Sequence, residues 1–187
     1  MTPRGLGPTG GVQYFPLLYK LRGRERYLLW VSNDKTAVAM HTQAMAPSFA
    51  TLRDLRDYAR LKDCKIESGE PKVHDLDWVA DWLDRPTKQI DAECALLAWN
   101  LFSDLAVSAH SSEFLAKDAK YPTVYKKLFF GNNLPSMTPA GRRYIPRWSR
   151  EEVDALADVL GTGLNLFESV VRDWPESATG PTRKHAG

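Results

Sequence analysis

Cysteine is scarce in this chain of 187 residues, which contains only two, Cys64 and Cys94. They stand 30 positions apart and form no CxxC pair, which excludes a dense disulfide framework and a zinc ribbon. A secreted domain of this size more often carries several bridges. We therefore expect reduced thiols in a cytosolic protein.

Long apolar runs are also absent. The longest uncharged apolar stretch, CALLAWNLFS, has about ten residues, whereas a helix that spans a bilayer needs about twenty. The opening residues, MTPRGLGPTGG, lack the apolar core of a signal peptide. Both absences predict a cytoplasmic protein without a membrane partner.

Motifs of nucleotide, acyl-transfer and metal chemistry are missing as well. The chain has no GxGxxG, Walker A, GxSxG or HExxH pattern, and its four histidines show no HxH or HxxxH spacing. We therefore expect no cofactor and no metal, and we assign no catalytic residue. Dispersed carboxylates can still form an active site that motifs miss, so an enzyme stays open as the alternative to a binding protein.

The chain does contain enough apolar material for a core. Hydrophobic residues make up 43% and charged residues 26%, which is a globular rather than a disordered composition. The length suits one domain. Because both ends are rich in Gly, Pro and small polar residues, we expect a disordered lead-in over 1–11, one globular domain over 12–174 and a flexible tail over 175–187.

The N-terminal part is predicted to be a short antiparallel β-meander over 12–41. The stretches VQYFPLLYK and RYLLWVS are rich in aromatic and branched residues, which favour strands. Gly23 between them supplies the positive φ that a hairpin turn requires. Pro16 lacks an N–H and indicates an edge strand or a bulge. KTAVAM is the expected third strand.

From residue 47 onward the apolar spacing becomes helical. We expect a helix capped by Ser48, and a second helix capped by Asp75 and ended by Pro86. Thr87 is the expected cap of a longer helix that runs to about His110. Its predicted buried stripe has spacings of four, three, four and four residues: Ile90, Cys94, Leu97, Leu101 and Leu105.

The last third is predicted to hold two helices separated by a long surface loop. VYKKLFF forms the first helix, closed by Gly131, and a Pro- and Gly-rich loop follows. Ser149 and Glu152 match a capping box that opens a final helix to Trp174. The predicted fold class is α+β, with a small N-terminal antiparallel β-meander packed on a predominantly helical domain over 47–174.

Cys94 and His110 suggest a thiol nucleophile, which needs an adjacent imidazole. On one helix, however, their sixteen-residue separation corresponds to about 24 Å along the axis. Cys94 also belongs to the predicted apolar stripe, where a free thiol behaves as a small hydrophobic group. The sequence therefore predicts a core cysteine.

Charge is distributed unevenly. Residues 63–113 hold eleven acidic and four basic residues, a net of −7, whereas the whole chain has a net charge of +2. Residues 121–148 hold five basic residues and no acidic one. One part of the surface is thus expected to attract a basic partner and another an anionic one.

The acidic segment carries the favoured binding site. Trp78 and Trp82 stand at i and i+4 among carboxylates, an arrangement suited to a protein interface with aromatic anchors and steering charges. The alternative is that both tryptophans are core, since Trp is highly buried on average. The predicted partner-binding residues are Asp75, Asp77, Trp78, Asp81, Trp82 and Asp84.

The basic loop is the alternative site, for an enzyme or a nucleic-acid-associated protein that binds an anionic ligand. It mixes cations with aromatic residues, as binders of phosphate backbones and bases do. Five charges over 28 residues are few for a nucleic-acid binder, so nucleic acid is not the expected partner. The candidate residues are Asn132, Asn133, Arg142, Arg143 and Arg147.

The stretch YFPLLYKLRGRERYLLW leading into acidic, Trp-bearing helices resembles the immunity proteins of bacterial polymorphic-toxin and contact-dependent growth inhibition systems. The resemblance implies an antitoxin that binds a cognate, often basic, toxin domain and covers its active site. It also implies that residues 74–104 meet the toxin, although many nuclease inhibitors are acidic overall and this chain is slightly basic. We therefore expect a non-enzymatic cytoplasmic protein-binding protein, monomeric or homodimeric.

Overall fold

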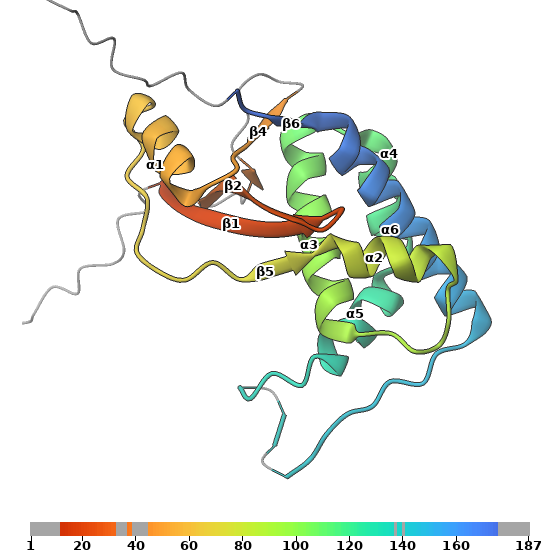
Figure 1. The fold of residues 1–187 in the computed structure, drawn as a ribbon. Coiled ribbons are helices and arrows are strands. Elements are labelled where there is room, and N and C mark those ends of the chain that lie inside the picture. Colours follow the sequence, from red (N-terminus) through yellow and green to blue (C-terminus); the bar gives the residue numbers. More distant parts are fainter. Residues whose placement is uncertain (1–11, 33–36, 39–44, 137, 140, 176–187) are drawn as a thin grey trace, which may run out of the picture.

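The computed structural model describes residues 12–32, 37–38, 45–136, 138–139 and 141–175, which form a small mixed sheet and a layer of helices that includes six helices in the described part (Figure 1). The predicted α+β class is confirmed. The expected lead-in and nearly all of the expected tail lie outside the described residues. No helix in the described part of the chain is long and apolar enough to cross a membrane.

The main sheet has the strand order β3-β2-β1-β5. Its bounds are β1 Gln13–Leu21, β2 Arg24–Ser32, β3 Ala37–Val38 and β5 Val73–Asp75. The first three strands are antiparallel, as predicted, and β5 adds to β1 in parallel. Arg22 and Gly23 both have positive φ, 55° and 69°, so a two-residue turn joins β1 to β2. The predicted role of Gly23 is confirmed.

Pro16 does not mark an edge strand, so that prediction is wrong. β1 lies inside the sheet, and its register with β2 runs without a bulge from Gln13↔Ser32 to Leu21↔Arg24. On its other side, β1 is bridged at Tyr14 and again from Leu18 onward. Pro16 falls between these two places, where its missing N–H breaks no pairing on that side.

Five of the helices correspond to predicted ones. They are α1 Leu52–Leu61, α2 Leu76–Asp84, α3 Ala92–Ala109, α5 Pro122–Gly131 and α6 Arg150–Val170. Asp75 caps α2 by accepting from the Trp78 N–H, and the Ser149–Glu152 capping box of α6 is formed in both directions. These two predicted caps are confirmed.

Other predicted helix ends are wrong. α1 spans Leu52–Leu61 and is capped by Thr51, because Ser48 lies in strand β4 (Ala46–Ser48). α3 is capped by Asp91 rather than Thr87. α6 ends at Val170, where β6 (Val171–Asp173) begins and pairs in parallel with β4. Helix α4, Ser112–Lys120, was not predicted from the sequence.

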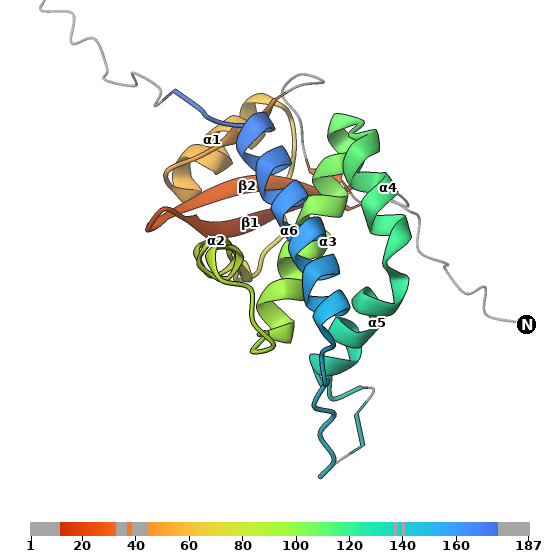
Figure 2. The same cartoon turned by 90° about the vertical axis from the view of Figure 1, so that its right-hand side faces the viewer.

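α3 is the centre of the helical layer. Figure 2 shows α6 across its length, with α2 to one side and α4 and α5 to the other. Because α3 is covered on several faces, its buried set is broader than the predicted stripe, and Cys94 and Leu97 are only partly buried. Gly163 does not break α6; its Cα lies so close to α3 that a Cβ would stand 2.1 Å from the Phe102 ring.

Candidate functional site

The acidic groups at the start of α2 are engaged within the chain. The Asp75 side chain caps the helix. Asp77 accepts a hydrogen bond of 2.9 Å from the Gly23 N–H in the β1–β2 turn, and its carboxylate lies 3.7 Å from the Lys20 ammonium group. Both carboxylates therefore hold α2 to its own surroundings and are not free for a partner.

The Trp pair also belongs largely to the core. Trp82 is 6% exposed and packs in the main hydrophobic cluster. Trp78 is partly buried against the same cluster and stacks on Trp82, with ring centroids 6.1 Å apart. As a surface anchor, Trp82 is therefore a wrong assignment, because the nine-residue helix must bury one face to stay folded.

Two predicted residues of the acidic site remain exposed. Asp81 and Asp84 follow Asp77 at i+4 and i+7, so the three lie along one face of α2. The side chains of Asp81 and Asp84 are exposed. What the structure leaves of the predicted acidic surface is this pair beside a half-buried Trp78.

The loop after α5, by contrast, is held firmly at its base. The Asn133 side-chain oxygen accepts from the Tyr144 N–H at 2.7 Å, and its amide nitrogen donates to the Tyr144 carbonyl at 2.9 Å and to the Gly131 carbonyl at 2.7 Å. Asn133 has a φ of 50°, a left-handed conformation that Asn tolerates better than most residues. This carboxamide fixes residue 144 beside residues 131–133.

A second tie joins the loop to α6. The Lys127 ammonium group binds the Glu152 carboxylate, donates to the Arg147 carbonyl at 2.9 Å and lies 5.3 Å from the centroid of the buried Trp148 ring. Burial alone would raise the pKa of Glu152, but hydrogen bonds from Lys127 and the Ser149 N–H outweigh it and lower that pKa. The segment of the loop that returns to α6 is thus held at Tyr144 by Asn133 and at Arg147 by Lys127.

A groove of about 610 Å³ runs between this loop and the start of α3. We call it the loop groove. It is lined on one side by residues 90–93 and on the other by residues 131–133 and 143–146. Asp91 and Glu93 contribute acid to one wall and Arg143 contributes a base to the other, while Ile90, Ile145 and Pro146 supply apolar surface.

Three large side chains at or next to the groove are exposed to solvent. Ile145 is 75% exposed, Phe130 51% and Tyr144 44%. In the described part of the chain, the guanidinium groups of the three loop arginines form no ion pair. We call this set the loop surface: Phe130, Arg142, Arg143, Tyr144, Ile145 and Arg147. In both views the loop extends beyond the helical layer (Figures 1 and 2).

The geometry does not favour the predicted anion site. The structure brings Asn132, Asn133 and Arg143 to one groove, but the Asn133 carboxamide is already bonded to backbone groups. Asn132 is the C-cap of α5. The facing wall carries Asp91 and Glu93, which repel an anion. Arg142 and Arg147 do not line the groove.

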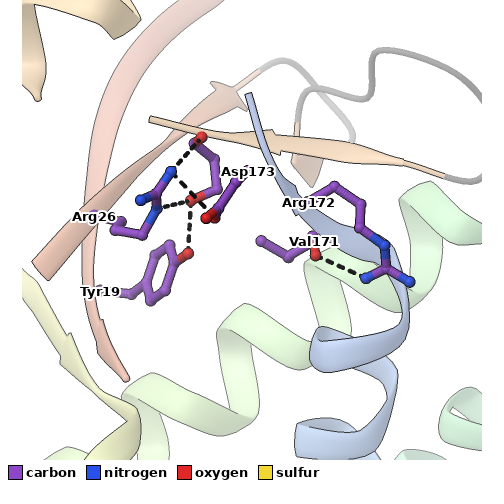
Figure 3. Close-up of polar contacts among 6 residues, drawn as sticks. Tyr19, Arg26, Val171, Arg172 and Asp173 are labelled. Carbon is purple, nitrogen blue, oxygen red and sulfur yellow. Dashed lines mark hydrogen bonds and ion pairs between the residues drawn. The ribbon is translucent and has the colours of Figure 1, made fainter. Parts of the chain in front are cut away.

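Figure 3 shows a polar cluster that joins the two ends of the domain. Arg26 donates to the Ser48 hydroxyl at 2.7 Å and to its carbonyl at 3.0 Å, and its guanidinium group lies 3.1 Å from the Asp173 carboxylate. The Tyr19 and Ser48 hydroxyls share a 2.7 Å hydrogen bond. Ser48 is fully buried, and burial raises the pKa of Tyr19. These groups fasten β4 and β6 to the sheet rather than form a nucleophile and base.

The structure also disfavours Cys94 as a catalytic nucleophile paired with His110. Cys94 and His110 lie at opposite ends of α3. Burial, followed by the nearby Asp91 carboxylate, raises the pKa of the Cys94 thiol to about 11, which disfavours the nucleophilic thiolate. Within the described residues, no three or more His, Cys, Asp or Glu side chains gather where they could hold a metal ion.

Ile145 and Phe130 were not among the residues predicted to bind a partner, and Tyr144 entered only as an aromatic neighbour of the loop arginines. The available signal was the run RRYIPRW. It sets an isoleucine and a tyrosine in a Pro-containing basic segment that cannot form a buried helix stripe. Loop residues of this kind mostly point to solvent, although Trp148 at the end of the run is buried in the core.

Comparison with known proteins shows similarity at the level of the fold. No family model matches the chain, and no curated protein matches it. Among solved structures, the chain is similar to the C-terminal domain of SatS, crystallised in complex with bromine, with a TM-score of 0.55 and 16% sequence identity. The match covers 88% of this chain and 94% of that one. At this identity the two share an architecture, and the likeness carries no function.

Proposed function

We propose that this chain is a non-enzymatic protein-binding protein and that it binds through the loop surface and the adjoining loop groove. The observation that carries the proposal is the exposure of Ile145 and Tyr144 on a loop whose backbone is held in place, next to the exposed Phe130 at the end of α5. Clustered apolar exposure of this kind marks interaction sites.

The support of the loop strengthens this argument. A loop that is ordered only on binding loses conformational entropy at that moment, whereas a loop already fixed does not. Asn133 holds Tyr144 through both of its backbone groups, and Lys127 holds the Arg147 carbonyl. The chain thus holds apolar side chains in water at a fixed position, and their exposure contributes nothing to the free energy of folding.

The charges specify the partner. Arg142, Arg143 and Arg147 favour an acidic patch on the partner. Across the groove, the Asp91 carboxylate caps α3, so that wall offers the partner mainly apolar surface. Lys72 lies 2.6 Å from Glu93 and offsets part of the acidity of that residue. We therefore propose a partner segment with an apolar residue flanked by charge, acidic where it meets the arginines.

In its most specific form, the proposal is that the chain is a cytoplasmic immunity protein and the partner a toxin domain. The size of the domain, its two free cysteines and the resemblance described from the sequence support this form. The loop surface replaces α2 as the proposed contact. The toxin surface that meets it would then be acidic, rather than basic as the sequence suggested.

The test is partner capture from the native host with a set of matched variants. I145D and R142E/R143E alter the loop surface, and D81K/D84K alters the exposed acids of α2. We expect the wild type and D81K/D84K to retain the same protein, which I145D loses. The captured protein is then purified, and its affinity for each variant is measured by calorimetry.

The same set identifies a failure. A partner that is lost by D81K/D84K and kept by I145D would move the binding site back to α2. A purified partner that has toxic activity, and loses it in proportion to the added wild-type chain, supports the immunity role. A partner without such activity leaves protein binding in place and removes that role.

A further inference from the structure

The segment of the loop that returns to α6, residues 143–147, has backbone groups that are bonded on one side and open on the other. Asn133 accepts from the N–H of Tyr144 and donates to its carbonyl. Both backbone groups of Tyr144 therefore point to the same side, as they do in a β-strand and not in a helix. The Asn133 carboxamide thus occupies the place of a neighbouring strand.

The peptide planes then determine the opposite edge. The described chain contains no cis peptide bond, and in a trans peptide the C=O and N–H point in opposite directions. The Arg143 carbonyl shares a peptide group with the Tyr144 N–H and points the opposite way. The Ile145 N–H likewise shares a peptide group with the Tyr144 carbonyl and points the opposite way. Both groups therefore face away from Asn133.

Nothing in the described part of the chain takes these two groups. Neither the Arg143 carbonyl nor the Ile145 N–H has a backbone partner there, and no described side chain bonds to either. The next residue, Pro146, has no N–H to satisfy. One acceptor and one donor thus stand together on the open edge, spaced as in a strand, beside the groove that Arg143 and Ile145 help to line.

We infer that the partner contributes an extended segment that pairs with the Arg143 carbonyl and the Ile145 N–H, adding a strand to the loop. This inference rests on the proposed function and specifies how it is carried out. Strand addition gives affinity through main-chain hydrogen bonds and specificity through alternate side chains. The alternate side chains of the partner enter the groove beside Ile145, and its acidic groups meet Arg143.

The probe is a twelve-residue peptide selected from a random library displayed on phage. Selection uses the full chain, with counter-selection on I145D. Amide exchange is then followed by NMR in the ¹⁵N-labelled protein. We expect the Tyr144 amide to be protected without peptide, because Asn133 holds it, and the Ile145 amide to exchange fast. Bound peptide should slow exchange of the Ile145 amide at least tenfold.

Two variants separate the main chain from the side chain at the same position. I145A removes the side chain and keeps the N–H, whereas I145P removes both. We expect I145P to weaken peptide binding at least tenfold beyond I145A, with an unchanged midpoint of chemical unfolding for both. As a second measurement, N-methylation of successive peptide residues should weaken binding most at the one residue whose N–H donates to the Arg143 carbonyl.

Equal affinities of I145A and I145P, or an unaltered exchange rate of the Ile145 amide in the complex, would overturn strand addition. In that case a peptide whose binding is lost in I145D still supports binding by the loop surface through side chains. If no peptide depends on Ile145, strand addition is also refuted, and capture of a folded partner decides the proposed function separately.

Discussion

The α2 segment and the 131–148 loop look similar as sequences, since each combines tryptophan or tyrosine with charge of one sign. In the structure they differ in what their side chains do. The polar and aromatic groups of α2 mostly serve the chain itself: Asp75 caps, Asp77 holds the hairpin turn and Trp82 fills the core. In the loop, Asn133 and the α5 residue Lys127 support the backbone, and the arginines and Ile145 remain exposed.

The difference teaches that local charge density does not show which charges are available. Carboxylates at a helix N-terminus are engaged as caps, because the free N–H groups there need acceptors. A short helix also buries its apolar stripe to gain stability. A proline-containing loop has neither demand, so its side chains stay free once a few bonds hold its backbone.

The largest expected contrast concerns core packing. Trp82→Ala should lower the free energy of unfolding by about 3–5 kcal/mol, because it leaves a cavity in the main core. Ile145→Ala should change it by less than about 0.5 kcal/mol. Chemical denaturation of both variants measures this. Similar values for the two would mean that Trp82 is not core or that Ile145 is.

Trp82→Phe refines the same test. The Trp82 indole N–H is, in the described part of the chain, a buried donor without a hydrogen-bond partner, and an unpaired donor costs about 1–3 kcal/mol. Phenylalanine removes that donor together with some volume. We expect a much smaller loss than for alanine, and an equal loss would show that the N–H is satisfied.

The next contrast tests the support of the loop. Asn133→Gly keeps access to positive φ but removes three hydrogen bonds, and should cost about 1–3 kcal/mol. It should also speed exchange of the Tyr144 amide. Asn132→Gly is the matched control, because that residue contributes a backbone cap. If the Tyr144 amide stayed protected in Asn133→Gly, the clamp would be refuted.

A smaller effect separates two carboxylates on one face of α2. Asp77→Ala removes the acceptor for the Gly23 N–H and should cost about 1 kcal/mol. Asp81→Ala, one turn later, should lie within about 0.5 kcal/mol of the wild type. Thermal unfolding of the pair at matched salt measures both. An equal cost would place Asp81 in the same supporting role as Asp77.

The smallest expected effect is a dependence on pH at the base of the loop. The pKa of Glu152 is lowered in the folded chain, chiefly by Lys127 against the opposing effect of burial. Its ionised form therefore stabilises the fold fully above the unfolded pKa of about 4.3. That contribution is lost as the pH falls through the lower folded value.

Glu152→Gln isolates this contribution, because glutamine still completes a capping box. The difference in free energy of unfolding between the wild type and this variant should be constant from pH 7 to about pH 5 and shrink below about pH 4. Denaturation curves across this range give the difference. A gap that is independent of pH would mean that Glu152 ionisation does not contribute.

The sequence predicted the elements whose signals are local. The hairpin required Gly23 at its turn, the capping box named Ser149 and Glu152, and Pro86 closed α2. It failed where a signal depends on partners. Ser48 has the chemistry of a helix cap, but its hydroxyl bonds instead to Tyr19 and Arg26, which are distant in sequence.

Short elements were missed for a related reason. Strands β4, β5 and β6 have three residues each, too few for an alternating pattern to appear. They exist because tertiary contacts supply their pairing. The stripe predicted for α3 was too narrow because helices on several sides bury it, and a one-sided periodicity cannot report that.

By itself the sequence determined the class of fold, the meander, most of the helices and the uneven distribution of charge, because propensity, capping and periodicity act within a few residues. Only the tertiary structure decided which charged residues remain available. Ion pairing and burial are settled by neighbours from other elements, which engage Asp77 and bury Trp82 in α2 but leave the side chains of the loop surface exposed.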